Sequence, residues 1–258
     1  MYITHIGTAC VLLEVGGVRL LTDPVFDPKG GHYHFGFGMR SDKTLAPACM
    51  PEAIGAVDAV LLTHDQHEDN LDVAGRKVLE GASRVVTTRA AGKRLGGALG
   101  ARCTPLAPWE SIEIAGAGGR VRVTATPARH GPPLSLPFVG EVVGFLIAAE
   151  GQTRGAVYMT GDTVWFAGVA EVARREKVGT LLLHLGRAAY GPLRFTMDAR
   201  EGVTAARVFG DAAVIPIHYD GWSHFHEPRI EAERTLAEAG LGDRVRWLVP
   251  GARTHVED

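Results

Sequence analysis

The stretch "LLTHDQHEDNLD", residues 61–72, holds two histidines, four acidic residues, a glutamine and an asparagine directly after two leucines. Leu61 and Leu62 close a mostly apolar run that starts at Val57, so the polar cluster begins where a buried strand is expected to end. Imidazole, amide and carboxylate groups at such a place either cap a following helix or bind a metal ion. The stretch therefore predicts a strand-to-helix junction and raises the question of a metal site.

The composition is that of an ordinary globular protein. Of the 258 residues, 46% are hydrophobic and 22% are charged, and the formal net charge is −2. This length is enough to bury a sizeable core. Basic residues are interspersed with acids, as in "ARREKVG", so no basic patch indicates nucleic-acid binding. The three cysteines, Cys10, Cys49 and Cys103, are far apart and form no CxxC pair, which is typical of reduced thiols in the cytosol.

Targeting signals are not evident in the sequence. The first ten residues, "MYITHIGTAC", lack the basic and apolar regions of a signal peptide. No apolar run reaches the roughly 18 residues of a transmembrane helix. We therefore expect a cytoplasmic protein without an integral membrane segment, whose partner is a small-molecule substrate rather than nucleic acid. A homo-oligomer remains open.

Apolar periodicity predicts a strand-rich first half and a second half in which strands and helices alternate. The predicted strands cover residues 2–6, 10–15, 18–23, 56–63, 84–88, 111–116, 120–128, 141–150, 155–160, 180–185, 212–219 and 245–250. The predicted helices cover residues 72–81, 89–99, 164–177, 198–210 and 227–240. Asp198 and Glu201 form a capping box at the start of one of them. One α/β domain over residues 1–258, with helices covering β-sheets, is the economical interpretation.

Histidine and aspartate residues recur at the carboxyl ends of these predicted strands. The residues in such positions are Asp23, His64, His130, Asp162, His184 and His218. Loops that follow strand ends converge at one edge of an α/β sheet, where functional sites are built. Imidazole and carboxylate are ligands that Zn²⁺, Mn²⁺ and Fe²⁺ accept. Unpaired burial of such a cluster is costly, and a bound metal would offset that cost.

Several motifs resemble the metallo-β-lactamase superfamily. "THDQHED" resembles the HxHxDH signature, "TGDT" resembles the bridging-aspartate strand, and "ARHG" and "IPIHYDGW" resemble the later histidine positions. Residues 3–26 resemble the opening hairpin of the branch that includes L-ascorbate-6-phosphate lactonase and N-acyl-phosphatidylethanolamine phospholipase D. The resemblance runs from about residue 2 to residue 226. It implies a four-layer αββα sandwich with the metals at one edge, between the two sheets.

The stretch 64–70 departs from HxHxDH, and one inserted residue reconciles the two patterns. The resemblance then implies a first metal site made of His64, His67 and His130. It implies a second site made of Asp69, Asp162 and His218. In this arrangement Asp69 orients the attacking hydroxide and Asp162 bridges the metals.

Asn70 stands where the second site would have its fourth ligand. An amide oxygen is a poorer ligand for borderline metals than imidazole, so we expect this site to be weaker, empty or suited to a harder ion such as Mn²⁺. Asn70 is also a good helix N-cap, and the two roles are compatible. Thr8 is a second departure, because this branch often carries histidine there.

Other polar residues have two open interpretations. His184 either approaches the metals or substrate or is a core histidine. Asp23 is expected to hydrogen-bond a ligand histidine from behind. His224 and His226 have H-x-H spacing, but their place on a loop before a helix favours a solvated loop.

The predicted function is metal-dependent hydrolysis of a small ester, lactone or phosphoester. One or two divalent metals, Zn²⁺ first and Mn²⁺ or Fe²⁺ as alternatives, would activate a water molecule and polarise the scissile group. The aromatic, Gly-rich loop 31–39 is the expected substrate-facing element. We also expect the substrate pocket to be lined by residues that follow ligand-bearing strands, namely Arg187, Tyr190, Arg194, Tyr219 and Trp222. Arginines there would suit an anionic substrate.

Two alternative functions stay open. A phospholipase D-like phosphodiesterase acting at membranes would need exposed aromatic side chains on the 31–39 loop. A degenerate, non-catalytic binding protein that kept the fold would account for Gln66, Asn70 and Thr8. The six ligand residues in matching strand contexts favour the hydrolase.

Overall fold

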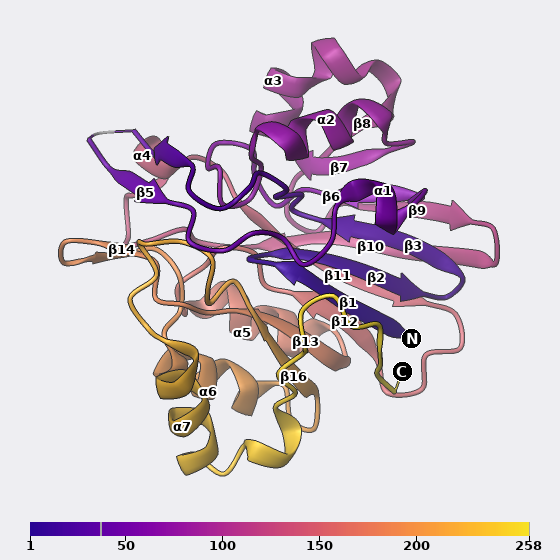
Figure 1. Ribbon diagram of the computed structural model, residues 1–258. Helices are drawn as coiled ribbons and strands as arrows, with labels where there is room; N and C mark the ends of the chain where they lie inside the picture. The colour runs from indigo at the N-terminus through magenta and orange to yellow at the C-terminus, as the bar shows by residue number, and fades with distance from the viewer. Residues whose placement is uncertain (37, 258) are drawn as a thin grey trace.

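The computed structural model describes residues 1–36 and 38–257, and within them two β-sheets pack face to face (Figure 1). The larger sheet has the strand order β17-β1-β2-β3-β6-β7-β8 and the smaller one has the order β16-β13-β12-β11-β10-β9. The strands of the larger sheet are β1 (Tyr2–Gly7), β2 (Cys10–Val15), β3 (Val18–Thr22), β6 (Ala59–Leu61), β7 (Val85–Thr88), β8 (Cys103–Leu106) and β17 (Thr254–His255). The strands of the smaller sheet are β9 (Ser111–Gly116), β10 (Gly119–Pro127), β11 (Val143–Ala149), β12 (Ala156–Met159), β13 (Val178–His184) and β16 (Ala213–Ile217).

Helices cover the outer face of each sheet, which confirms the αββα sandwich. Helices α2 and α3 lie on the larger sheet, and α5, α6 and α7 lie on the smaller one (Figure 1). The helices are α1 (Pro51–Ile54), α2 (Val73–Gly81), α3 (Arg89–Leu99), α4 (Leu136–Val139), α5 (Ala167–Arg175), α6 (Ala199–Val208) and α7 (Arg229–Glu238). No helix in the described part of the chain is long and apolar enough to cross a membrane.

The central strands are apolar on both faces because both faces are buried. Along β13, Leu181 and Leu183 pack under the helices, whereas Leu182 between them packs between the two sheets. Val60 and Leu61 of β6 likewise point to opposite faces. This two-residue alternation explains why these segments appear in the sequence as continuous apolar runs.

The parallel strands direct the site residues to one edge. Strands β3, β6 and β7 run parallel, as do β12, β13 and β16, so the loops after them emerge together. Two short hairpins and helix α4 flank this edge, and both chain termini lie at the opposite end (Figure 1). The hairpins are β4 (His32–His34) with β5 (Arg40–Asp42), and β14 (Ala189–Tyr190) with β15 (Leu193–Arg194).

Two predicted elements differ from the structure. Residues 245–250 are not a strand: Val245 forms one isolated parallel bridge to Val214, and Val249 is 68% exposed, so this segment has no sheet face to pack on. The stretch 31–39 was predicted to be loop, but it contains β4, which pairs with β5. One predicted helix cap is confirmed: the Asp198 carboxylate accepts a hydrogen bond from the Glu201 amide at 2.9 Å.

A buried ion pair ties the β4–β5 hairpin to helix α2. The carboxylate of Asp72, the N-cap of α2, accepts hydrogen bonds from the amides of Gly75 at 2.8 Å and Asp27 at 2.6 Å. Lys43, one residue after β5, donates to the same carboxylate at 2.9 Å. Both charged side chains are almost fully buried, and the Lys43 ammonium also lies 5.6 Å from the Trp222 ring centre. Three donors on one carboxylate offset its burial.

Candidate metal centre

Three imidazoles converge at the edge between the sheets. His64 follows β6, His67 lies in the next loop, and His130 follows β10. His67 Nδ1 is 3.2 Å from His64 Nε2 and 3.0 Å from His130 Nε2. In a tetrahedral site with metal–nitrogen bonds of ~2.0–2.1 Å, ligand nitrogens are about 3.3 Å apart. The spacing of this first cluster therefore fits one metal ion.

Two imidazoles of the first cluster, those of His64 and His67, are held in the form that binds metals. Burial lowers the pKa of His64 well below its usual value, and the neighbouring His67 and His130 lower it further. Burial and the neighbouring His130 lower the pKa of His67 to about 3. Both imidazoles are therefore neutral at pH 7, and only a neutral imidazole offers a lone pair to a metal.

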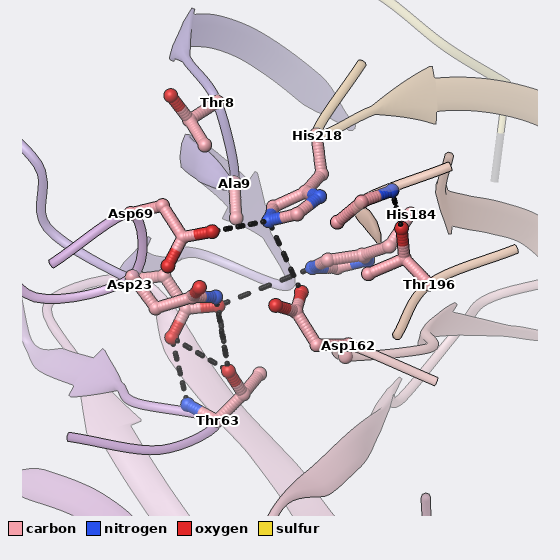
Figure 2. Close-up of polar contacts among 12 residues, drawn as sticks. Thr8, Ala9, Asp23, Thr63, Asp69, Asp162, His184, Thr196 and His218 are labelled. Carbon is pink, nitrogen blue, oxygen red and sulfur yellow. Dashed lines mark hydrogen bonds and ion pairs between the residues drawn. The ribbon is translucent and has the colours of Figure 1, made fainter. Parts of the chain in front are cut away.

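Two carboxylates and a fourth imidazole form a second cluster beside the first (Figure 2). His218 Nε2 lies 3.5 Å from Asp69 Oδ2 and 3.3 Å from Asp162 Oδ1. The other oxygen of Asp162 is 3.9 Å from His64 Nε2 and 4.0 Å from His130 Nε2. Asp162 therefore faces both clusters, one with each oxygen.

The electrostatics of the second cluster suit a cation. Burial would lower the pKa of His218, but the carboxylates of Asp162 and Asp69 outweigh it and raise that pKa to about 9. Burial raises the pKa of Asp162, whereas hydrogen bonds and charges from His218 and His224 overcome burial and hold the pKa of Asp69 well below its usual value. Asp162 Oδ1 and His218 Nε2 are buried without a hydrogen-bond partner among the described residues. Such buried, unpaired ligand atoms fit a divalent metal.

Asn70 is a donor between the carboxylates and not a helix cap. With its amide nitrogen turned toward them, it donates to Asp69 Oδ1 at 3.1 Å and to Asp162 Oδ2 at 3.2 Å. The opposite orientation offers one longer contact, 3.4 Å to Thr63 Oγ1. The acceptor-only carboxylates favour the first orientation. The N-cap prediction was wrong, because Asp72 caps α2.

Thr63 contacts the Asp23 carboxylate (Figure 2) and lies between it and His64, the ligand histidine that Asp23 was expected to contact. Thr63 Oγ1 is 3.0 Å from both Asp23 oxygens and 3.0 Å from His64 Nδ1. Because the carboxylate accepts from the Thr63 hydroxyl, that hydroxyl accepts from His64 Nδ1–H and leaves Nε2 free to face the cluster. His184 lies behind this group: its Nε2 is 4.0 Å from Asp23, and its Nδ1 is 3.1 Å from Thr160 Oγ1.

Gln66 occupies the second histidine position of the family motif but points away from the clusters. Its amide nitrogen donates to the carbonyl oxygens of Val139 at 2.8 Å and Glu141 at 2.9 Å. His67 is instead the residue that joins His64. The side chains therefore lie as expected from the family motif with one inserted residue.

A small pocket, with a cavity volume of about 40 Å³, opens onto both clusters. Its lining is mostly apolar and comprises Phe35, Met39, Arg40, Ser41, His67, Asp69, His130, Val139, Ala188, Ala189, Tyr190, Phe195 and His224. Tyr190 belongs to this set, and its hydroxyl donates to the Gly38 carbonyl at 3.2 Å. The other four residues predicted to line the pocket lie elsewhere.

The two predicted pocket arginines are not among the lining residues. Arg187 is exposed. Arg194 forms ion pairs with Asp198 at 2.7 Å and Glu201 at 3.1 Å, on helix α6 and its cap. The acids on α6 provide the counter-charge that a substrate was expected to provide.

The two predicted pocket aromatics at 219 and 222 are buried. Tyr219 packs in the core under α6 and α7, with its ring 5.0 Å from that of Trp247. Trp222 donates its indole N–H to Thr8 Oγ1 at 3.2 Å. Thr8 therefore serves as a structural acceptor beside the site.

His224 contacts the second cluster, although its segment was predicted to be a solvated loop. It is half-buried, with Nε2 3.1 Å from Asp69 Oδ2 and Nδ1 2.6 Å from Ser41 Oγ. The H-x-H spacing that includes His226 was the available signal. His226 itself is exposed, and its Nε2 contacts the Ala189 carbonyl at 3.1 Å.

The aromatic side chains described on the 31–39 loop turn inward. The Phe35 ring centre lies 5.5 Å from that of His67, and the Tyr33 ring centre lies 5.0 Å from that of Trp222. These two rings therefore do not form the exposed aromatic surface that the membrane phospholipase predicted. Phe37 lies outside the described residues.

The fold matches solved structures over the full length of the chain. Isothiocyanate hydrolase from Delia radicum gut bacteria has a TM-score of 0.83 and 20% identity, and the match covers 100% of both chains. A possible metal-dependent hydrolase from Veillonella parvula has a TM-score of 0.84 and 20% identity, with 99% of both chains covered. At this identity the likeness shows a shared fold.

Sequence relatives point to the same family. A protein described as "UPF0173 metal-dependent hydrolase" in Methanosphaerula palustris is 32% identical over 227 residues, which cover 86% of this chain and 85% of that protein. A protein of the same description in Methanoregula boonei is 30% identical over 228 residues, covering 86% and 83%. The family described as "Beta-lactamase superfamily domain" matches residues 18–219. The chain therefore belongs to the metallo-β-lactamase superfamily and to its family of UPF0173 metal-dependent hydrolases.

Proposed function

We propose that this metal-dependent hydrolase, a single domain over residues 1–258, cleaves a small neutral ester or lactone that carries an apolar group. The apolar pocket above the clusters carries this proposal. Phe35, Met39, Val139 and Phe195 supply apolar surface directly beside the ligand residues. The lactonase-like opening segment of the sequence supports the same substrate class.

The charge distribution favours a neutral substrate over a phosphoester. Arg187 and Arg194 lie outside the pocket, and Arg194 is already paired. Arg40 is the cationic side chain in the described lining, and it is exposed at the rim. Bound metals would add positive charge at the floor, but the described lining adds only this exposed arginine for the outer oxygens of a phosphoryl group.

The ligand types suggest which metals are held. Three imidazoles at His64, His67 and His130 suit Zn²⁺, with Mn²⁺ or Fe²⁺ as alternatives. Asp69, Asp162 and His218 would hold a second, weaker ion. A bound divalent metal supplies an activated water at neutral pH and polarises the substrate carbonyl.

The side chains of this chain then have separate roles. Asp69 lies at the pocket floor, where it orients the attacking water. Asp162 fixes the spacing of the two clusters, because each of its oxygens faces one of them. Phe35 and Phe195 exclude bulk water from the reacting carbonyl.

Metal analysis followed by a substrate panel tests this function. Protein purified without added metal is assayed by elemental analysis, then with p-nitrophenyl butyrate, γ-butyrolactone and bis(p-nitrophenyl) phosphate. We expect bound metal, and faster turnover of the ester or lactone than of the phosphodiester. Asp69→Asn should remove the activity at unchanged thermal stability. Preference for the phosphodiester would overturn the substrate class, and absence of metal after Zn²⁺ or Mn²⁺ reconstitution would overturn the mechanism.

One observation favours a second candidate, hydrolysis of lipid esters at a membrane. Leu134, Leu136 and Phe138 are 90%, 60% and 61% exposed, and they lie on or next to α4 at the site edge. Sedimentation with phosphatidylglycerol–phosphatidylcholine vesicles tests this alternative. Binding that is lost in Leu134→Ser with Phe138→Ser would favour it, and no binding would exclude it.

A further inference from the structure

His224 lies where the pocket meets the second cluster. It lines the pocket together with Ser41 and Asp69, and it contacts both. Its chain segment follows β16 and is separate from the loop that carries Asp69. The contact therefore links two segments that are 155 positions apart in the sequence.

The hydrogen bonds fix the orientation of this imidazole. A carboxylate only accepts, so the 3.1 Å contact to Asp69 Oδ2 requires a hydrogen on His224 Nε2. On the other side, Nδ1 lies 2.6 Å from the Ser41 hydroxyl. The rings of Phe35 and Phe225 flank the imidazole, with centres 5.0 Å and 4.6 Å away. The side chain is thus anchored on both edges and both sides before any ligand binds.

Asp69 consequently receives one donor on each oxygen. Asn70 donates to Oδ1 at 3.1 Å, and His224 donates to Oδ2 at 3.1 Å. His218 Nε2 lies near the same Oδ2, at 3.5 Å. The direction in which Asp69 presents its remaining lone pairs is therefore set by Asn70 and His224.

We propose that His224 is a positioning residue, which orients Asp69 for the second metal site through the Ser41–His224–Asp69 chain. The inference rests on the proposed metal centre. Because Asn70 acts as a donor, the second cluster offers three side-chain ligands, and its affinity depends strongly on how Asp69 is held. Outer groups that orient ligands typically change metal affinity or activity by roughly 10- to 100-fold.

Zn²⁺ titration of the metal-free full-length protein tests this role without needing a substrate. Calorimetry separates the tighter and weaker sites in wild type, His224→Ala, His224→Gln and the control His226→Ala. His226→Ala removes a histidine two positions away that does not contact Asp69. We expect His224→Ala to weaken the second site by roughly 10- to 100-fold and to leave the first site unchanged. His224→Gln should restore most of the affinity, because its amide can donate to Asp69 and accept from Ser41.

Kinetics on whichever ester the wild type hydrolyses add an independent readout. A positioning role predicts a lower kcat with little change in KM, restored by His224→Gln. A higher KM with unchanged Zn²⁺ affinity would show that His224 contacts substrate only, and would overturn the proposal. Equal losses in His224→Ala and His224→Gln would overturn it in favour of simple packing.

Two further measurements keep the outcomes distinct. If His224→Ala unfolds, Ser41→Ala removes the anchor and keeps the ring, and it should weaken the second site by a smaller factor. Unchanged affinity in Ser41→Ala would then overturn the proposed chain. Failure of wild type to bind any Zn²⁺ would instead overturn the proposed function.

Discussion

Asp162 lies beside both ligand clusters, but opposite electrostatics stabilise the residues within each of them. In the first cluster, burial keeps His64 and His67 neutral, so the imidazoles can lie together without a counter-charge. In the second, Asp69, Asp162 and His218 depend on one another's charge. The comparison teaches that spacing sets the affinity of the first site, whereas orientation and charge set that of the second.

Removing Asp162 should have the largest effect, because it faces both clusters. We expect Asp162→Asn to lower kcat by at least about 10³-fold, roughly 4 kcal/mol of transition-state stabilisation, and to reduce the metal content of both sites. Elemental analysis and steady-state kinetics measure this, with the exposed Asp211→Asn as control. Loss of one metal with the other fully retained would show that the clusters are independent.

Position 70 should change the second site more than the first, and in opposite directions for two substitutions. Asn70→Ala removes a donor from both carboxylates, and we expect about tenfold weaker binding of the second metal. Asn70→His supplies an imidazole ligand, and we expect tighter binding. Metal stoichiometry at limiting Zn²⁺ and competition with a chelator measure both. Equal shifts of the two sites in either variant would contradict the placement of Asn70 at the second site.

Mutations in the pocket should change KM and leave the metal affinity unchanged. Tyr190→Ala removes part of the apolar lining, and we expect KM for an apolar ester to rise about fivefold, ~1 kcal/mol. Tyr190→Phe keeps the ring and loses only the bond to Gly38, so its KM should stay close to that of wild type. An equal rise in both variants would mean that the hydroxyl, and not the ring, contacts substrate.

The smallest effect is expected at Arg194, whose partners are on the protein surface. Because the side chain is 36% exposed, Arg194→Ala should lower the free energy of unfolding by less than about 1 kcal/mol. Chemical denaturation measures this, and KM for the ester should not change. A rise in KM for an anionic substrate would show that Arg194 contacts the substrate after all. Arg187→Ala is the matched control.

The sequence was sufficient to predict which strand ends come together. His64, Asp162 and His218 each follow a buried parallel strand, and parallel strands necessarily deliver their next residue to a common edge. The apolar runs predicted helices covering β-sheets, and the αββα layers followed from the resemblance to the superfamily. Such features depend on main-chain direction and period, which a sequence encodes locally.

Side-chain direction beyond those ends depends on contacts that the sequence does not display. Arg194 turns toward acids on α6, and Tyr219 turns into the core under the helices. His224 turns inward because Ser41, far away in the chain, offers a hydroxyl. Tertiary contacts set the direction of each of these side chains. A residue's position after a ligand-bearing strand therefore predicts that it lies near the site, but not where its side chain points.

The Lys43–Asp72 ion pair has a consequence for how this enzyme can diversify. It fixes the base of the β4–β5 hairpin to the helix that follows the ligand loop. The tip of that hairpin, with Gly36 and Gly38 in left-handed conformations, extends over the pocket from this fixed base. We therefore expect mutations at Met39 to change substrate preference while the catalytic floor keeps its geometry, whereas Phe35 also contacts His67 and His224. Laboratory evolution of new specificities would start most productively at Met39, with Lys43 and Asp72 left unmutated.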